Sequence, residues 1–98
     1  MDINVVKEVI NEFYNNEKII SIDLKLKNNS ETHILTSCID SISIYYESLK
    51  VIYTEQNYLN FVGTIVKSVQ SSINYYNIVD IIAITLNKQS EMLKNVNN

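Results

Sequence analysis

Residues 18–27 read KIISIDLKLK, and apolar and polar side chains alternate along this stretch. Successive side chains of a β-strand point to opposite faces, so this alternation predicts a strand with one buried and one solvated face. The face predicted to enter the core consists of Ile20, Ile22, Leu24 and Leu26. The opposite, solvated face consists of Ser21, Asp23, Lys25 and Lys27. A core built from such a strand needs further elements to cover its apolar face.

The segment before this strand has the spacing of an amphipathic helix. Asp2 is placed to cap a helix that runs from about residue 3 to residue 16. Apolar side chains recur at helical spacing along one side of it: Ile3, Val6, Val9, Ile10, Phe13 and Tyr14. A one-sided helix buries its stripe. We expect the protein's own sheet to cover this stripe, and the groove of a partner protein is the alternative.

The segment after the strand predicts further strands. Asn28, Asn29 and Ser30 form a turn, because Asn tolerates a left-handed backbone and bonds locally through its side chain. Residues 31–38, 40–46 and 49–54 then have strand-like composition. The first half of the chain is therefore expected to be one helix followed by a meander of three or four strands.

Residues 57–73 are compatible with two structures. Their apolar positions fall at helical spacing, with Asn57 as a cap, and this pattern favours a second helix. Their composition is rich in Val, Ile, Thr and Phe, which favours a strand, and Gly63 would weaken a helix interior by about 1 kcal/mol. In the strand interpretation the chain bends at Gly63 and turns at residues 70–72. The strand is slightly preferred.

Two segments forty positions apart resemble each other, LTSCIDSISIYY at 35–46 and YYNIVDIIAITL at 75–86. The three identical positions pair Asp40 with Asp80, Ile42 with Ile82, and Ile44 with Ile84. Three explanations of this similarity, which we call the sequence echo, stay open: a strand-entry pattern in an isoleucine-rich chain, a duplicated structural unit, or a duplicated binding site. The preferred interpretation is that the echo marks two core strands.

Length and composition indicate a single domain and the kind of partner that it binds. The chain has 98 residues, and we expect residues 1–98 to form one domain with a polar C-terminal tail over about 88–98. The net charge of −3 and the absence of arginine argue against nucleic acid as a partner. Abundant Ile, Asn, Lys and Tyr with scarce Gly, Ala and Pro indicate an AT-rich genome, such as that of a phage, a mobile element or a virus.

The N-terminal residues do not have the features of a signal peptide, and no apolar run has the length of a membrane span. The expected location is therefore the cytoplasm of a bacterial or infected host cell. Cys38 is the only cysteine, so an intramolecular disulfide is excluded.

Residues with catalytic chemistry are few and scattered. His33 is at an odd and Cys38 at an even position of one predicted strand, so their side chains point to opposite faces and are not expected to come into contact. Asp23, Asp40 and Asp80 have no partner that the sequence identifies. One glycine cannot build a glycine-rich phosphate loop, and no cluster has metal-ligand spacing. We therefore expect no catalytic, cofactor-binding or metal-binding site, and no enzymatic activity.

Tyrosine is the residue type that suggests an interface. The chain has seven tyrosines, and two pairs are adjacent, at 45–46 and 75–76. Neighbours on a strand face opposite ways, so one member of each pair is expected outside, and Tyr46 is assigned to the core with Ile42 and Ile44. Exposed tyrosine is enriched at protein interfaces. The candidate interface residues are Tyr45, Tyr53, Tyr58 and Tyr75.

These observations predict an α+β domain, with an N-terminal helix packed on a mainly antiparallel sheet of four to six strands. The predicted function is that of a small non-catalytic protein that binds another protein, for instance a phage or mobile-element inhibitor that occupies a surface of a host defence protein. The alternatives are a small-ligand or nucleotide-binding sponge, with Lys25, Lys27 and Lys67 near phosphates, and a purely structural subunit of an oligomer. A homodimer is compatible with each of these functions.

Overall fold

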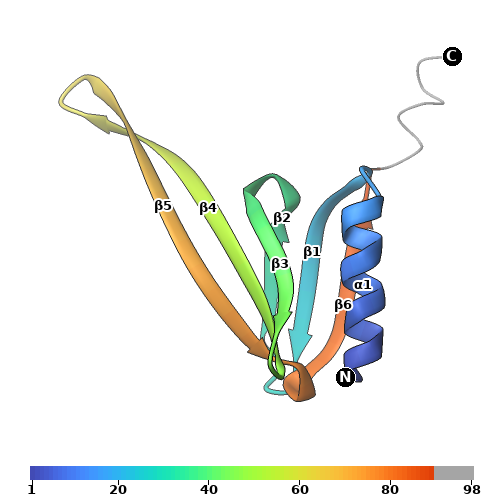
Figure 1. Ribbon diagram of the computed structural model, residues 1–98. Helices are drawn as coiled ribbons and strands as arrows, with labels where there is room; N and C mark the ends of the chain where they lie inside the picture. The colour runs from blue at the N-terminus through green and yellow to red at the C-terminus, as the bar shows by residue number, and fades with distance from the viewer. Residues whose placement is uncertain (90–98) are drawn as a thin grey trace, which may run out of the picture.

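The computed structural model describes residues 1–89, which form one helix and six strands (Figure 1). The elements are α1 (Ile3–Asn15), β1 (Ile19–Leu26), β2 (Glu31–Leu35), β3 (Ile39–Tyr45), β4 (Ser48–Phe61), β5 (Thr64–Asn77) and β6 (Ile81–Lys88), with short 3-10 turns η1 (Thr36–Cys38) and η2 (Ile78–Asp80). All paired strands are antiparallel. The predicted α+β class is confirmed.

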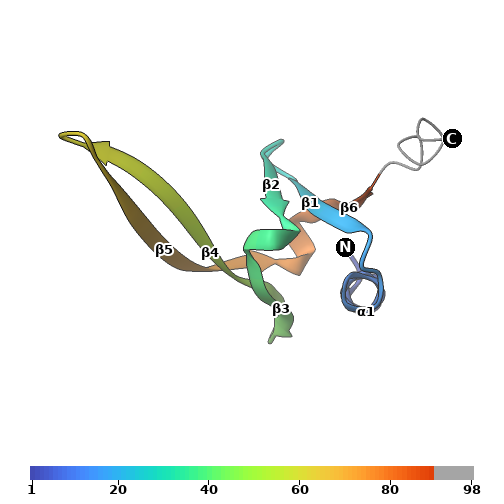
Figure 2. The same cartoon turned by 90° about the horizontal axis from the view of Figure 1, so that it is seen from above.

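The strands form two three-stranded sheets, with the orders β2-β1-β6 and β3-β4-β5. Their facing sides enclose the core, and Figure 2 shows α1 at the side of the molecule where β6 and β3 lie. The buried apolar cluster contains Val6, Ile22, Leu24, Ile34, Ile42, Leu49, Val51, Ile78 and Ile81. The strands predicted for one sheet are therefore divided between two layers, because each layer needs the other to cover its apolar face.

Helix α1 has the expected start and covers one side of the core. The side chain of Asp2 accepts a hydrogen bond from the backbone N–H of Asn4 at 2.7 Å, which caps the first turn. Val6 is fully buried, and Ile10 and Phe13 pack against the core cluster. The protein's own sheets therefore cover the middle of the apolar stripe, whereas Ile3 and Tyr14 at its ends are exposed.

The chain contains two units with the same order of elements. The first is β1-β2-η1-β3 and the second is β4-β5-η2-β6, and each unit places a hairpin before a 3-10 turn and a third strand. The third strands are exchanged: β6 pairs with β1 of the first unit, and β3 pairs with β4 of the second. The duplicated structural unit is thus present as a topological repeat.

The structural register of this repeat differs from the sequence echo by two positions. In each unit the third strand has one extra residue near its start, Asp40 in β3 and Ile82 in β6, where the ladder shifts. These two bulge residues correspond to each other, whereas the echo pairs Asp40 with Asp80. Ile42 is 3% exposed, but its echo partner Ile82 is 49% exposed. The three sequence identities therefore do not mark equivalent positions.

Strand β1 also contains an irregularity, and it corrects one predicted core residue. The ladder between β1 and β6 shifts between Ile19 and Ser21, so Ile20 is the extra residue. Ile20 is exposed, while Ile19 and Ser21 are buried. Ile22 and Leu24 are buried as predicted, and Leu26 packs against the core. The prediction was wrong for Ile20, assigned to the core, and for Ser21, assigned to the solvated face, because a bulge reverses strand parity on one side of it.

Residues 57–73 are strands, and the ambiguity with a helix is resolved. β4 and β5 form one long hairpin that turns at Val62 and Gly63, whose φ angles are 51° and 78°. Two positive φ angles are those of a type I′ turn, and glycine adopts this conformation without strain. Gly63 is therefore in a hairpin turn and not at a bend within a strand. The turn predicted at residues 70–72 is wrong, because these residues lie inside β5.

Two further predictions concern the polar C-terminal tail and membrane-spanning segments. Lys88 is the last residue of β6, and the rest of the predicted polar tail, from residue 90 on, lies outside the described residues. Within residues 1–89 no helix has the length and apolar character needed to cross a membrane.

Candidate protein-interaction surface

The β4–β5 hairpin extends far beyond the body of the molecule (Figure 1). We call residues 55–70 the arm. None of them belongs to the core cluster or packs against it. The corresponding hairpin of the first unit is shorter, since β1 and β2 have 8 and 5 residues whereas β4 and β5 have 14 each. The arm is thus an extension of the second hairpin that the rest of the described chain does not cover.

Strand parity divides the β3-β4-β5 sheet into two faces. Leu49 and Val51 are buried and point toward the other sheet, so the residues between and beside them point away from it. We call this second side the outer face. Its large side chains are Tyr45, Lys50, Ile52, Tyr58, Ile65, Lys67, Val69, Ile73 and Tyr75. The outer face therefore carries a row of aromatic and aliphatic groups that no element within residues 1–89 covers.

An aromatic–cation cluster lies at the base of the outer face. The ring centroids of Tyr45 and Tyr75 are 5.8 Å apart. The Nζ atom of Lys50 lies 5.2 Å from the centroid of Tyr45 and 5.9 Å from that of Tyr75. Both distances are within the range of cation–π attraction. The three side chains hold one another in place, which lowers the entropy that they would lose on binding.

The predicted interface tyrosines occupy different environments. Tyr45 and Tyr75 are half-exposed on the outer face, and Tyr58 is 68% exposed on the arm. Tyr53 instead points inward and packs against the core cluster. Of the four candidates, three therefore share the outer face and one does not.

The assignment of Tyr46 to the core is wrong. Tyr46 is 82% exposed and has a φ angle of 54°, because it lies in the turn after β3 and not within the strand. Strand parity therefore does not apply to it. Its ring meets the ring of Tyr45 edge to face, with centroids 4.6 Å apart.

The opposite face of the arm, its inner face, is also apolar. Leu59 and Val66 are opposite each other in the β4–β5 ladder, and Phe61 follows near the tip. All three are exposed, although they have the same parity as the buried Leu49 and Val51. This face would be core if the other sheet reached as far as the arm does. Sequence periodicity alone could not reveal this, because it does not indicate how far the covering sheet extends.

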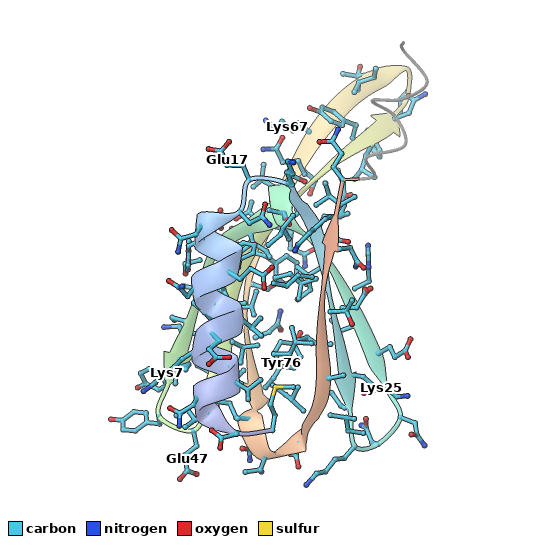
Figure 3. The ribbon with its side chains drawn as sticks, turned by 90° about the vertical axis from the view of Figure 1, so that its right-hand side faces the viewer. Lys7, Glu17, Lys25, Glu47, Lys67 and Tyr76 are labelled. Carbon is cyan, nitrogen blue, oxygen red and sulfur yellow. The ribbon has the colours of Figure 1, made fainter. Side chains whose placement is uncertain are left out.

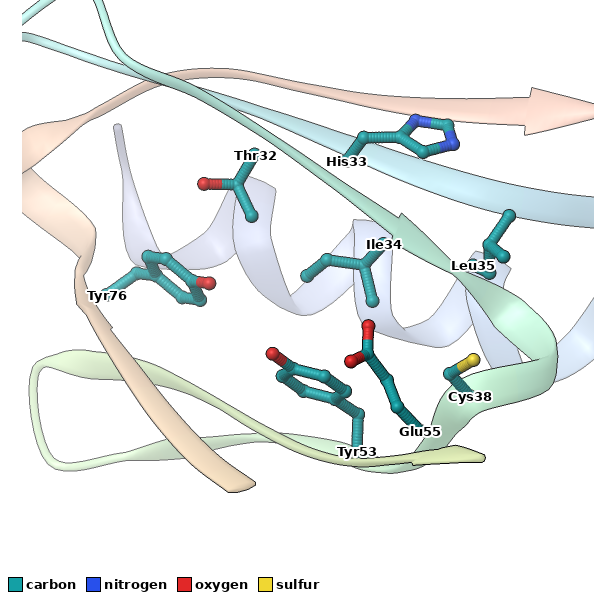
Figure 4. A pocket seen from close by; sticks show the side chains of 8 residues that line it. All are labelled: Thr32, His33, Ile34, Leu35, Cys38, Tyr53, Glu55 and Tyr76. Carbon is teal, nitrogen blue, oxygen red and sulfur yellow. The ribbon is translucent and has the colours of Figure 1, made fainter. Parts of the chain in front are cut away.

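A pocket of about 210 Å³ opens at the side of the molecule between β2 and the β4–β5 hairpin. It is lined by Thr32, His33, Ile34, Leu35, Cys38, Tyr53, Glu55 and Tyr76. Figure 4 shows the Tyr53 hydroxyl and the Glu55 carboxylate pointing toward β2, with His33 on the opposite side of that strand from Ile34. Burial raises the pKa of the Tyr76 hydroxyl, and the neighbouring Thr32 hydroxyl offsets part of this rise.

His33 does not pair with Cys38, its potential catalytic partner in the sequence. His33 Nδ1 contacts Asp23 Oδ1 at 2.5 Å, across the β1–β2 ladder. The Nδ2 group of Asn87 donates to the other carboxylate oxygen of Asp23 at 2.7 Å. The hydrogen bonds from Asn87 and then His33 hold the pKa of Asp23 below its usual value. Asp23 therefore has partners on both neighbouring strands, which the sequence did not identify.

Asp40 also has a partner that its sequence neighbourhood did not suggest. Its Oδ2 atom accepts a hydrogen bond from the Thr54 hydroxyl at 2.6 Å, and that hydroxyl lies 3.0 Å from the Ser71 hydroxyl. This chain of contacts links the bulge of β3 to the base of the arm. The sequence could not identify this partner, because the bulge position of Asp40 directs its side chain toward β4.

Cations and metal ligands are dispersed in the described part of the chain. Figure 3 shows Lys67 on the arm and Lys25 at the far end of the other sheet, so they do not converge on one phosphate. The pocket lining includes a carboxylate and no lysine. Residues 1–89 bring together no group of three or more His, Cys, Asp or Glu side chains that could hold a metal ion.

Comparisons of the chain with protein-family models, with curated proteins and with solved structures find no match.

Proposed function

We propose that this chain is a non-catalytic protein-binding protein that works by covering a surface of another protein with its outer face. The observation that carries the proposal is the exposed row of Tyr45, Tyr58, Tyr75 and aliphatic side chains on one side of the β3-β4-β5 sheet. Helix α1 and the β2-β1-β6 sheet cover the other side, and nothing in the described chain covers this one. Exposed apolar surface of this kind marks binding sites in soluble proteins.

The chemistry of the outer face indicates the kind of protein surface that it fits. Tyr contributes a large contact area at a low entropy cost, and its hydroxyl can bond to polar groups at the rim. Lys50 and Lys67 lie on this face although the chain as a whole has a charge of −3. We therefore expect a flat, partly apolar partner surface that carries carboxylates. An inhibitor of a host defence protein, encoded by a phage or mobile element and acting in the cytoplasm, is the proposed role.

The test compares three purified, tagged proteins: the wild type, the double variant Tyr45→Ser/Tyr75→Ser, and Ile20→Ser. Ile20 is an exposed apolar residue on the other sheet and serves as the matched control. The wild type and the control should bind the same partner from host extract with equal affinity. The tyrosine variant should bind it more weakly by at least about 1 kcal/mol, the usual threshold for an interface residue that matters. Equal binding by all three proteins would refute the role of the outer face.

A small-ligand function is the second candidate, and the pocket between β2 and the hairpin favours it. Tyr53, Tyr76 and Glu55 would offer two phenol groups and one carboxylate to a small neutral or cationic ligand. The volume of about 210 Å³ is below the range of most drug-sized sites. Native mass spectrometry of the purified protein should show a bound mass under this function and the bare chain under the first.

A further inference from the structure

The two sheets have four edge strands, β2, β6, β3 and β5, and the first three are protected against pairing with a strand of another molecule. At β3, the Tyr14 hydroxyl accepts from the backbone N–H of Ile42 and donates to its C=O, both at 2.9 Å, so α1 occupies this edge. β2 is only 5 residues long. β6 is linked to the helix region by the Lys88–Glu12 ion pair at 2.9 Å and by a hydrogen bond from the Gln89 N–H to the Lys18 C=O. Short or covered edges are the usual protection against unwanted strand pairing.

The outer edge of β5 lacks all of these protections. The strand has 14 residues, contains no proline and no acidic residue, and carries one charge, at Lys67. In the described part of the chain, its backbone makes no hydrogen bond to any element other than β4. A long, regular and nearly uncharged edge is a template for another strand.

We propose that β5 pairs antiparallel with β5 of a second copy of this chain, which joins the two β3-β4-β5 sheets into one continuous sheet. This inference goes beyond the proposed function, because a two-fold axis perpendicular to the sheet leaves both outer faces exposed on the same side. The dimer would present two copies of the tyrosine surface to a partner.

The pattern of β5 favours itself as the pairing strand. A two-fold axis between the two β5 strands pairs odd-numbered residues with odd-numbered residues and even with even. If the axis passes beside Val69, Ile65 lies opposite Ile73 of the second copy. Lys67 then lies opposite Ser71, and Val69 lies opposite its own counterpart. A centre at Lys67 would instead bring two lysines together, which is destabilising. On the outer face, the aliphatic residues of β5 thus meet aliphatic residues, and the single charge of the strand meets a neutral polar side chain.

The proposed pairing also accounts for the inner face of the arm. In the antiparallel arrangement, the arm of one copy runs along the base of the other, beside β5 and on the side where the pocket opens. Leu59, Phe61 and Val66 would then lie along this open side.

The turn geometry identifies the backbone groups available for pairing. A two-residue turn makes Phe61 and Thr64 a hydrogen-bonded pair, and bonded and non-bonded pairs then alternate along the hairpin. Val69 and Gln56 form a non-bonded pair, so the N–H of each points outward, Val69 toward the free edge of β5 and Gln56 toward that of β4. Proline at either position would leave the hairpin ladder intact.

These two positions give a matched test by size-exclusion chromatography with light scattering. The wild type should have twice the mass of one chain, Val69→Pro should be a monomer with an unchanged melting curve at low concentration, and Gln56→Pro should remain a dimer. A monomeric wild type across the accessible concentration range would overturn the proposal. A dimer that survives Val69→Pro but not Gln56→Pro would overturn it as well, because pairing would then use β4.

A cysteine crosslink tests the register independently. In a Cys38→Ser background, Val69→Cys should form an intermolecular disulfide on mild oxidation, since the two residues at a bonded pair lie within reach of a disulfide. Lys67→Cys should crosslink much less. A reversed preference would refute the register centred at Val69. The Tyr45→Ser variant changes the outer face on β3 and leaves the pairing strand intact, so it should keep the dimer mass while it weakens partner binding. Failure of the outer-face function and failure of the dimer are therefore separable.

Discussion

Single inserted residues determine which side chains of this protein are buried. Ile20, Asp40 and Ile82 are each an extra residue in a strand ladder, and each is exposed. A bulge changes the parity of the strand on one side of it. For this reason Ile82 lies outside although the sequence gives it the same setting as the buried Ile42.

The core position of Leu24 leads to a prediction at the residue scale. Leu24 is 1% exposed and belongs to the core cluster, whereas its neighbour Lys25 is exposed. Leu24→Ala should lower the free energy of unfolding by about 2–5 kcal/mol, as buried leucine truncations do, and Lys25→Ala should change it by less than about 0.5 kcal/mol. Urea denaturation of both variants measures the difference. Equal losses would contradict the register of β1.

A pH dependence follows from the burial of Tyr76. Burial raises the pKa of this tyrosine above the ordinary value of 10.0, so the unfolded chain loses the proton first as the pH rises. Its contribution to stability is therefore complete below pH 10 and is lost as the pH rises through the higher pKa of the folded state. The melting temperature of the wild type should fall more steeply above pH 10 than that of Tyr76→Phe. If the melting temperatures of the wild type and of Tyr76→Phe fall equally with pH, burial does not raise the pKa of Tyr76 in the folded state.

At the scale of elements, the arm is the part of the fold with the least support from the rest of the chain. A two-stranded hairpin is marginally stable on its own in water, and the arm has no third strand beyond Glu55. It persists in this structure as a continuation of the β4–β5 ladder that begins inside the core at Leu49. Its exposed apolar residues are therefore in keeping with the interface that we propose.

Removing the arm tests this view of the hairpin. Glu55 and Gln70 are directly paired at a hydrogen-bonded position of the ladder, so an Asn-Gly turn can join them in place of residues 56–69. Because the arm contributes nothing to the core cluster, the shortened chain should keep its melting temperature to within a few degrees. Circular dichroism measures the transition. A chain that fails to fold without the arm would show that the hairpin nucleates or supports the body.

At the scale of the whole molecule, the exchanged third strands make the two sheets interdependent. Each sheet takes two strands from one unit and one strand from the other. Neither sheet can therefore be lost without removing a strand from both units. Helix α1 adds a further link, since Tyr14 bonds to the backbone of β3 while Glu12 pairs with Lys88 of β6.

This arrangement predicts a single cooperative unfolding transition. The β2-β1-β6 sheet contains no tyrosine, so tyrosine fluorescence reports on the other sheet and the helix. Leu24→Ala weakens the tyrosine-free sheet, yet it should lower the midpoint seen by fluorescence as much as the midpoint seen by far-ultraviolet circular dichroism. Two separate midpoints would indicate that the sheets unfold independently.

Local patterns in the sequence were sufficient to predict several elements. Asp2 before a 3.6-residue stripe indicated α1, alternation indicated β1, and Asn28-Asn29 indicated the turn after it, where Asn29 indeed has a φ of 65°. Composition with Gly63 favoured strands over a helix for residues 57–73. Parity placed Tyr45 outside. Each of these properties depends on neighbours within a few positions, which the sequence displays directly.

The tertiary structure alone decided the rest. Periodicity cannot locate a bulge, so the exposure of Ile20 and Ile82 depended on pairing with strands far away in the chain. It cannot divide strands between sheets, so the partners of Asp23 on β2 and β6 were hidden. Above all, apolar alternation in β4 and β5 looks the same inside and outside the core. Whether Leu49 or Leu59 is buried depends on where the opposite sheet ends, and that is a property of the assembled layers.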